Sequence, residues 1–280
     1  MATALSPNRR TALVLAVGLA VLCANLFAGW LFGVPLGYGF ALPLGVFLGP
    51  VGAVGVALGG AVEALLAGEV PAVAVARGLS DLLLVGLCYA LWNGRVVARP
   101  ADSARAVGGT LIAAAAVALV ATAFGSTALA TLRSLVGPYS VALAGPALLG
   151  DRLLSAIVVG PPLLVLVSGA TRVGVAPPLR GPRVGPARLV AVGLVTVAWA
   201  GSAFTLSLLR GDIVAFDSTR ATLAGALPSS LEPIVLGLLL DEYWLVLAGS
   251  FIAATLAVTL CLWWRQRTPR VRRQKSHPNR

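Results

Sequence analysis

Five charged side chains lie within or at the edges of long apolar stretches of the sequence, and their types could support chemistry inside a membrane. They are Glu63, Arg77, Asp81, Asp151 and Arg152. A charge at the centre of a bilayer costs from about 2.5 kcal/mol upward, so each group needs a partner or water. Arg77 and Asp81 are four residues apart, which places them on one helical face at pairing distance. The pattern predicts a polar cluster within a helical bundle.

This cluster has two interpretations. In the first it lines a ligand cavity, and the candidate ligand-binding residues are Glu63, Arg77, Asp81, Tyr139 and Asp151. In the second, Arg77 and Asp81 form a purely structural pair, while Glu63, Asp151 and Arg152 reach the headgroups by snorkelling. Asp151 is expected near the N-terminus of its helix, where the helix dipole favours a negative charge.

Other reactive groups are few. Cys23, Cys88 and Cys261 lie in apolar runs without disulfide or metal spacing, and the only histidine, His277, lies in the polar tail. Histidine-dependent catalysis and a histidine or cysteine metal site inside the membrane are therefore excluded, and no phosphate-binding loop of the Walker type is present. We expect no enzyme, no cofactor and no bound metal.

The composition identifies the solvent of this chain as lipid. Of its 280 residues, 58% are hydrophobic and 11% are charged, and the mean hydropathy is +0.93. In a soluble domain about a quarter of the residues are charged, so this composition indicates an integral membrane protein. Its net charge of +11 comes from residues between apolar runs and at the C-terminus, a distribution that sets topology and does not indicate nucleic-acid binding.

Apolar runs of about 20 residues predict the spanning helices of an all-α, polytopic bundle. The run Phe40–Leu66 is long for one span and is broken by Gly49-Pro50, so we expect two short helices folded back as a hairpin. With that hairpin there are about eight transmembrane helices. The other runs are Thr11–Phe32, Val73–Trp92, Ala106–Phe124, Ala147–Val167, Leu189–Leu209 and Tyr243–Trp264.

Basic residues predict the orientation. With a cytoplasmic N-terminus and eight crossings, sixteen Lys and Arg residues fall inside and four outside. A single crossing by Phe40–Leu66 would invert the later loops and place the basic tail outside, which favours the hairpin. We expect a multi-pass protein of the cell membrane with both termini in the cytoplasm. Four aromatic residues then flank an outer loop as part of an aromatic belt, namely Trp30, Phe32, Tyr38 and Phe40.

Composition shifts divide the chain into four parts. Four prolines and three arginines in Thr171–Ala187, with Arg188 directly after, indicate a cytoplasmic linker. The predicted parts are a six-helix core over 1–170, the linker 171–187, two additional helices with an outer loop over 188–264, and a basic cytoplasmic tail over 265–280.

The first helix carries a strip of small residues at four-residue spacing. Its members are Ala12, Ala16, Ala20, Ala24 and Ala28. Because close van der Waals contact is a main source of helix association in lipid, such a strip favours a partner helix. The alternative is that it only reflects the high alanine content of the chain.

Three segments resemble the membrane-embedded substrate-binding subunits of energy-coupling-factor transporters. They are the hairpin Leu48–Gly55 with Gly59, Gly60 and Glu63, the segment Gly86–Trp92, and the segment Ala156–Leu164. The resemblance covers Thr11–Ser168. It implies a six-helix bundle that binds a vitamin, a nucleobase-like compound or a metal ion from outside, with alanines of the first helix docking on a transmembrane coupling subunit powered by separate ATPases.

The chain departs from that family in its two additional helices, in lacking N-terminal histidines for a metal, and in matching no vitamin-specific site. We therefore expect a substrate-binding subunit for uptake of a vitamin-like solute, with a small-molecule ligand, the lipid bilayer, a coupling subunit and ATPases as partners. The alternative is a membrane sensor or scaffold without a transported ligand.

Overall fold

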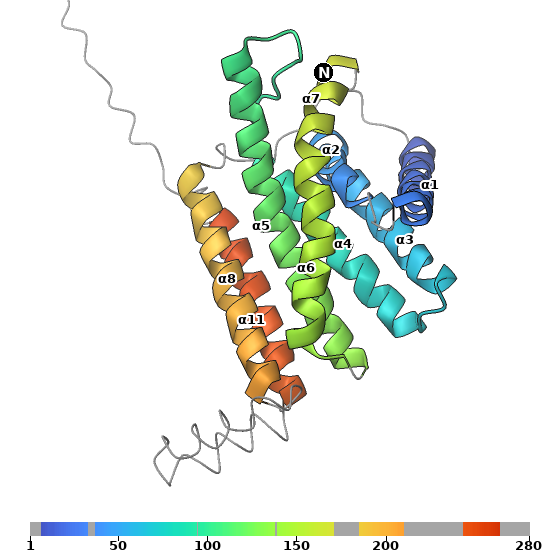
Figure 1. Cartoon of the computed structure of the whole chain (residues 1–280), viewed down its shortest axis with the longest axis vertical. Helices are drawn as coiled ribbons and strands as arrows, with labels where there is room; N and C mark the ends of the chain where they lie inside the picture. Colours follow the sequence, from blue (N-terminus) through green and yellow to red (C-terminus); the bar gives the residue numbers. More distant parts are fainter. Residues whose placement is uncertain are drawn as a thin grey trace, which may run out of the picture.

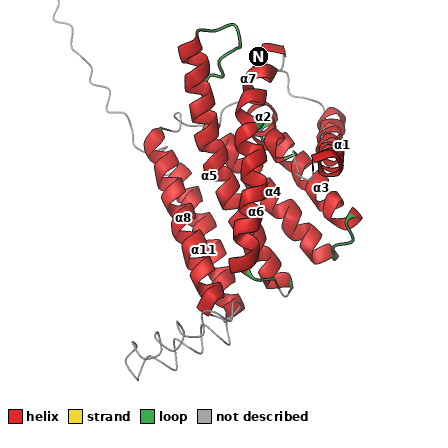
Figure 2. Ribbon diagram, viewed as in Figure 1, coloured by secondary structure: helices red, strands yellow, loops and turns green. Residues whose placement is uncertain are grey.

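The computed structural model describes residues 7–32, 37–93, 95–137, 139–170, 185–209 and 243–263. Throughout these residues the regular structure is helical and contains no strand (Figure 2). Most of the predicted linker, the loop between the last two spans and the basic tail lie outside the described residues. The helices are α1 (Pro7–Phe32), α2 (Tyr38–Leu48), α3 (Pro50–Leu66), α4 (Pro71–Trp92), α5 (Ala104–Val136), α6 (Val141–Val158), α7 (Gly160–Ala170), α8 (Pro186–Leu209) and α11 (Tyr243–Trp263).

Five helical segments are long and apolar enough to cross a bilayer, which identifies a multi-pass membrane protein. They are Pro71–Trp92, Ala104–Val136, Val141–Gly169, Pro186–Leu208 and Tyr243–Trp263. Three shorter apolar segments precede them, namely Thr11–Phe27, Tyr38–Leu48 and Pro50–Leu66. The eleven residues of α2 span about 16 Å, roughly half of a hydrocarbon core, so α2 does not cross alone.

The predicted break at Gly49-Pro50 is confirmed. Gly49 has a φ of 60°, which favours glycine, and Pro50 begins α3, where its missing N–H is not needed. The two helices fold back on each other, so that the start of α2 and the end of α3 lie close together. Asn25 contacts both ends: its side chain accepts from the Gly37 N–H, before α2, and donates to Glu63, near the end of α3. The hairpin packs against α4, with α1 on the other side of α3 (Figure 1).

Close helix contacts in the hairpin region depend on glycine. Gly55 and Gly59 of α3 lie against Val17 and Gly18 of α1, and a Cβ on Gly59 would lie 2.6 Å from the Gly18 carbonyl oxygen. Close backbone approach of this kind supplies the dispersion energy that holds helices together in lipid. It fixes α1 beside α3 and so determines which α1 side chains face the bundle.

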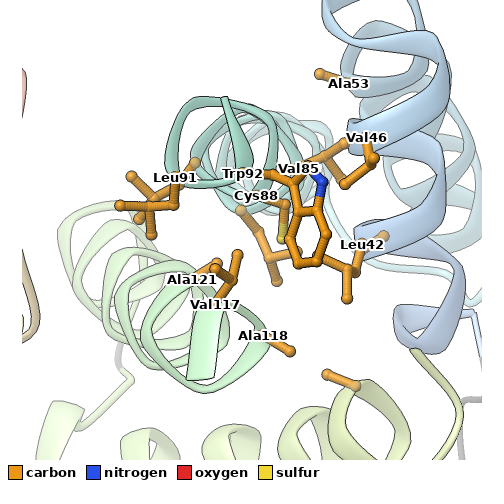
Figure 3. Packing of buried hydrophobic residues seen from close by; sticks show 14 of the residues in the cluster. Leu42, Val46, Ala53, Val85, Cys88, Leu91, Trp92, Val117, Ala118 and Ala121 are labelled. Carbon is orange, nitrogen blue, oxygen red and sulfur yellow. The ribbon is translucent and has the colours of Figure 1, made fainter. Parts of the chain in front are cut away.

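The apolar core lies where α2, α4 and α5 meet (Figure 3). Leu42 and Val46 from α2 contact the α4 side chains Val85, Cys88 and Trp92. Small α5 side chains complete this packing from the other side and are fully buried, namely Val117, Ala118 and Ala121. The α8–α11 pair packs on the opposite face of α5, at the far edge of the bundle from α1 (Figure 1).

Two predicted span boundaries were wrong. The fifth span was expected to end at Phe124, but α5 continues to Val136. The polar side chain of Thr127 is accommodated within the helix, because its hydroxyl donates to the Ala123 carbonyl. The sixth was expected to begin at Ala147, but α6 begins at Val141, after the cap provided by Ser140.

Candidate functional site: a buried charged cluster

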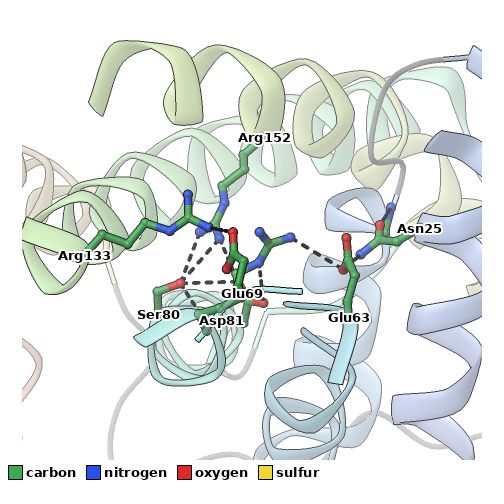
Figure 4. A network of polar contacts seen from close by, with 9 residues as sticks. Asn25, Glu63, Glu69, Ser80, Asp81, Arg133 and Arg152 are labelled. Atoms are coloured by element: carbon green, nitrogen blue, oxygen red, sulfur yellow. Dashed lines mark hydrogen bonds and ion pairs between the residues drawn. The ribbon is translucent and has the colours of Figure 1, made fainter. Parts of the chain in front are cut away.

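Charged and polar side chains from five helices meet inside the bundle and form what we call the charged cluster (Figure 4). Asp81 lies ten residues from the start of α4, at the α3–α4 turn, and Arg152 lies eleven residues from the start of α6, at the α5–α6 turn. Each is therefore about 15 Å along its helix from that end. The members are Asn25 (α1), Tyr38 (α2), Glu63 (α3), Arg77, Ser80 and Asp81 (α4), and Arg152 (α6).

Asp81 is the centre of the charged cluster. Its Oδ1 lies 3.1 Å from Arg152 Nη2, and its Oδ2 lies 3.5 Å from Arg77 Nε. The side chains of Asp81 and Arg152 are 3% and 1% exposed, so this pair is almost completely buried inside the protein. Gly60 of α3 makes room for the carboxylate, because a Cβ there would collide with Asp81 Oδ2.

Ser80 joins α4 to α6 beside that pair. Its Oγ accepts from Nη1 and Nη2 of Arg152, each at 3.4 Å, and donates to the Arg77 carbonyl at 2.9 Å. Arg152 of α6 can contact both Ser80 and Asp81 of α4 only when the two helices pack in one register. The contact therefore couples helix packing to electrostatics.

A second branch of the charged cluster reaches α1. Arg77 Nη2 lies 3.5 Å from Glu63 Oε2, and the same oxygen accepts a hydrogen bond of 2.6 Å from Asn25 Nδ2. Asn25 Oδ1 in turn accepts from the Gly37 N–H at 2.7 Å. The branch connects α4, α3, α1 and the start of α2 in one line of polar contacts (Figure 4).

The Tyr38 ring lies against both arginines. The guanidinium carbon of Arg152 is 4.5 Å from the centre of the ring and that of Arg77 is 5.4 Å away, within cation–π range. The Tyr38 hydroxyl is buried and forms no hydrogen bond within the described part of the chain. The prediction that Tyr38 belongs to an aromatic belt was wrong, because the residue is only 4% exposed.

A second ion pair, Glu69–Arg133, lies outside the charged cluster. It joins the α3–α4 turn to the last turn of α5. The guanidinium carbon of Arg133 lies 5.5 Å from the centre of the Tyr139 ring, so Tyr139, one of the predicted ligand-binding residues, belongs to this pair and not to the charged cluster. The sequence interpretation did not include Glu69, because it falls in a turn.

Asp151 also lies apart from the charged cluster. Its side chain is exposed, and it occupies the middle of α6, so the expected position near a helix N-terminus was wrong. The helix begins six residues earlier than the hydropathy indicated, which moves Asp151 away from the favourable end of the dipole. Its neighbour Arg152 points inward, and the snorkelling expected for Arg152 is contradicted by its burial.

The alanine strip faces away from the bundle. Ala12, Ala16 and Ala20 are exposed and Ala24 is half-buried, whereas Val17 and Val21 pack inward. The side chain of Ala28 lies outside the described residues. Three positions of the strip are therefore left uncovered by the described part of the chain, and Ala24 is partly covered.

The charged cluster carries two carboxylates and two guanidinium groups, so its formal charges balance. Among the described residues, no group of three or more His, Cys, Asp and Glu is arranged to hold a metal ion. The arrangement is suited to binding a polar molecule by charge-assisted hydrogen bonds. Comparison of the chain with family models, with curated proteins and with solved structures gives no match in any of the three.

Proposed function

We propose that this protein is the membrane-embedded substrate-binding subunit of an uptake transporter for a small, vitamin-like solute, and that the solute binds at the charged cluster. The observation that carries the proposal is the convergence of Glu63, Arg77, Asp81 and Arg152 within the membrane-spanning region. Intramembrane ionisable residues are costly and typically mark ligand or ion sites. The resemblance of the Leu48–Glu63 hairpin to energy-coupling-factor subunits supports the same class.

The orientation proposed from the basic residues directs the charged cluster toward the outside. The α3–α4 and α5–α6 turns then face the exterior, and both termini lie in the cytoplasm of a cell membrane. A single cysteine at Ser276 should resist an impermeant thiol reagent in intact cells, whereas one at Ser218 should react. The experiment requires a background without Cys23, Cys88 and Cys261. Reaction at Ser276 in intact cells would contradict the topology.

The exposed alanine strip supports a partner helix in a transmembrane coupling subunit, which separate ATPases would power. Ala16→Leu, Ala20→Leu and Ala24→Leu together should abolish copurification with a coexpressed coupling subunit, because leucine side chains separate the two backbones. Ala198→Leu on the exposed face of α8 adds the same side chain elsewhere and should leave copurification intact. Retained copurification of the triple variant would mean that the strip only reflects the high alanine content of the chain.

Ligand binding is tested by thermal unfolding of the purified chain in detergent. Water-soluble vitamins and nucleobases are added singly, and a ligand at a hundred times its Kd should stabilise the protein by about 2.7 kcal/mol. A compound that stabilises the parent chain should lose its effect in Arg77→Gln, because that change removes guanidinium donors from the charged cluster.

The balanced charges also favour a second function. Because Asp81 and Glu63 already pair with arginines of the same chain, the charged cluster could serve only to hold a membrane scaffold or sensor together. In that case no compound stabilises the protein and no coupling subunit copurifies with it. These two results together would select the scaffold over the transporter subunit.

A further inference from the structure

The electrical balance of the charged cluster restricts the charge of what it can bind. Glu63 and Asp81 offset Arg77 and Arg152, and all four are paired in the structure. Charges interact strongly in a medium of low dielectric constant, and an added ion would leave one charge without compensation. A ligand without net charge, either uncharged or zwitterionic, leaves the balance intact.

The hydrogen-bonding groups that remain unused are mainly donors. Arg77 contacts Glu63 and Asp81 at 3.5 Å, longer than the 2.7–3.2 Å of ordinary N–H···O bonds, and its Nε forms no hydrogen bond among the described residues. The Tyr38 hydroxyl and Arg152 Nε are likewise buried without a hydrogen-bond partner there. Each carboxylate, by contrast, already has a close donor, Asn25 Nδ2 at 2.6 Å for Glu63 and Arg152 Nη2 at 3.1 Å for Asp81. The charged cluster therefore has more donors than acceptors.

Buried donors without partners are uncommon in proteins and are expensive to maintain. Tyr38 is held in place independently of its hydroxyl, since its ring packs against two guanidinium groups. The backbone beside it is also fixed, because the Gly39 N–H donates to Ser155 Oγ at 2.9 Å. The phenol is thus oriented without using its O–H, which leaves that group free for a ligand.

From this balance and this donor excess we infer that the charged cluster binds a small solute without net charge that presents carbonyl or carboxylate oxygens to Arg77 and Tyr38. The inference rests on the proposed function and deepens it, because it names the substrate class. A neutral heterocyclic amide and a zwitterionic amino acid both satisfy this description, whereas simple anions and cations do not.

The test sorts a panel of compounds by their charge at neutral pH and measures the melting temperature of the full chain in detergent. The panel includes the near-isosteric set of neutral nicotinamide, anionic nicotinate and cationic 1-methylnicotinamide, together with uracil, glycine betaine and choline. Stabilisation only by uncharged or zwitterionic compounds supports the inference. Stabilisation by an anion or a cation overturns it while the proposed function stands, and stabilisation by none counts against both.

A charge-altering variant makes the test independent of which compound binds. Glu63→Gln keeps the side-chain size and leaves the charged cluster with one excess positive charge. The ratio of the affinity for an anionic isostere to the affinity for the neutral compound should therefore be about tenfold higher in this variant than in the parent chain. Asp151→Asn removes a negative charge that is exposed and outside the charged cluster, and should leave that ratio unchanged. An unchanged ratio in Glu63→Gln overturns the inference.

Discussion

The charged cluster and the α8–α11 pair are held in place by different forces. The charged cluster joins α1, α3, α4 and α6 through ion pairs and hydrogen bonds with defined partners. In contrast, α8 carries one charged residue, Arg188, and α11 carries none. Trp199 of α8 instead packs between Phe124 and Phe251, with ring centres 5.1 and 5.7 Å apart.

The difference concerns tolerance to substitution. Apolar packing in lipid depends on shape and dispersion, so similar side chains can replace one another. A buried ion pair depends on each partner, and loss of one leaves the other charge uncompensated. Substitutions should therefore act strongly and specifically at the charged cluster and weakly at the α8–α11 pair.

The largest effect is expected for Asp81→Asn. The change preserves side-chain size but leaves Arg152 and Arg77 without their shared counter-ion, and should lower the free energy of unfolding by about 3–5 kcal/mol. Thermal unfolding in detergent measures it. Asp151→Asn on the exposed face of α6 is the matched control and should have little effect. Equal losses in the two variants would remove the distinction between buried and exposed carboxylates.

Pairing Asp81→Asn with Arg152→Gln sharpens this prediction. The double variant removes both charges of the most deeply buried pair, whose atoms lie 3.1 Å apart, and should recover part of the lost stability. A double variant less stable than either single one would show that the two side chains contribute independently to stability, which would contradict the ion pair between Asp81 and Arg152.

Gly60→Ala should have an intermediate effect of about 1–3 kcal/mol, because the added methyl group displaces the Asp81 carboxylate from its arginines. Gly86→Ala on α4 is the control, since a Cβ there meets nothing within 4 Å. It should be neutral or slightly stabilising, as expected for Gly→Ala in a helix. Chemical denaturation of the two variants under identical conditions compares them, and equal stabilities would contradict the assigned contact.

Trp199→Phe should have a smaller effect, about 0.5–1.5 kcal/mol, because it removes one hydrogen bond from Nε1 to Ser250 Oγ at 3.3 Å and keeps an aromatic ring. Ligand binding should not change, since Trp199 lies at the α8–α11 pair. A change in ligand affinity here would mean that the two regions are coupled, and the contrast between them would fail.

The sequence predicts much of the fold because its signals are local. Composition indicates a membrane protein, Gly49-Pro50 marks the hairpin tip, and the four-residue spacing of Arg77 and Asp81 correctly predicts their pairing. Each of these features depends on residues close together in the chain.

The rest of the charged cluster depends on contacts between distant segments. Asn25 and Glu63 are 38 residues apart, and Ser80 and Arg152 are 72 apart, so neither contact has a local signature. Asp151 and Arg152 are adjacent, yet one is exposed and the other is buried. Hydropathy alone could not decide which residue faces inward, because the decision requires the start and rotation of α6.

The most direct test of the central claim, that the charged cluster binds a ligand, is the affinity of Tyr38→Phe for a compound that stabilises the parent chain. The hydroxyl makes no hydrogen bond among the described residues, so its removal should leave the melting temperature without ligand unchanged or slightly raised. Affinity should fall about fivefold to tenfold, the equivalent of one lost hydrogen bond. Unchanged affinity, measured by the same melting assay over a range of ligand concentrations, would contradict a ligand at the charged cluster.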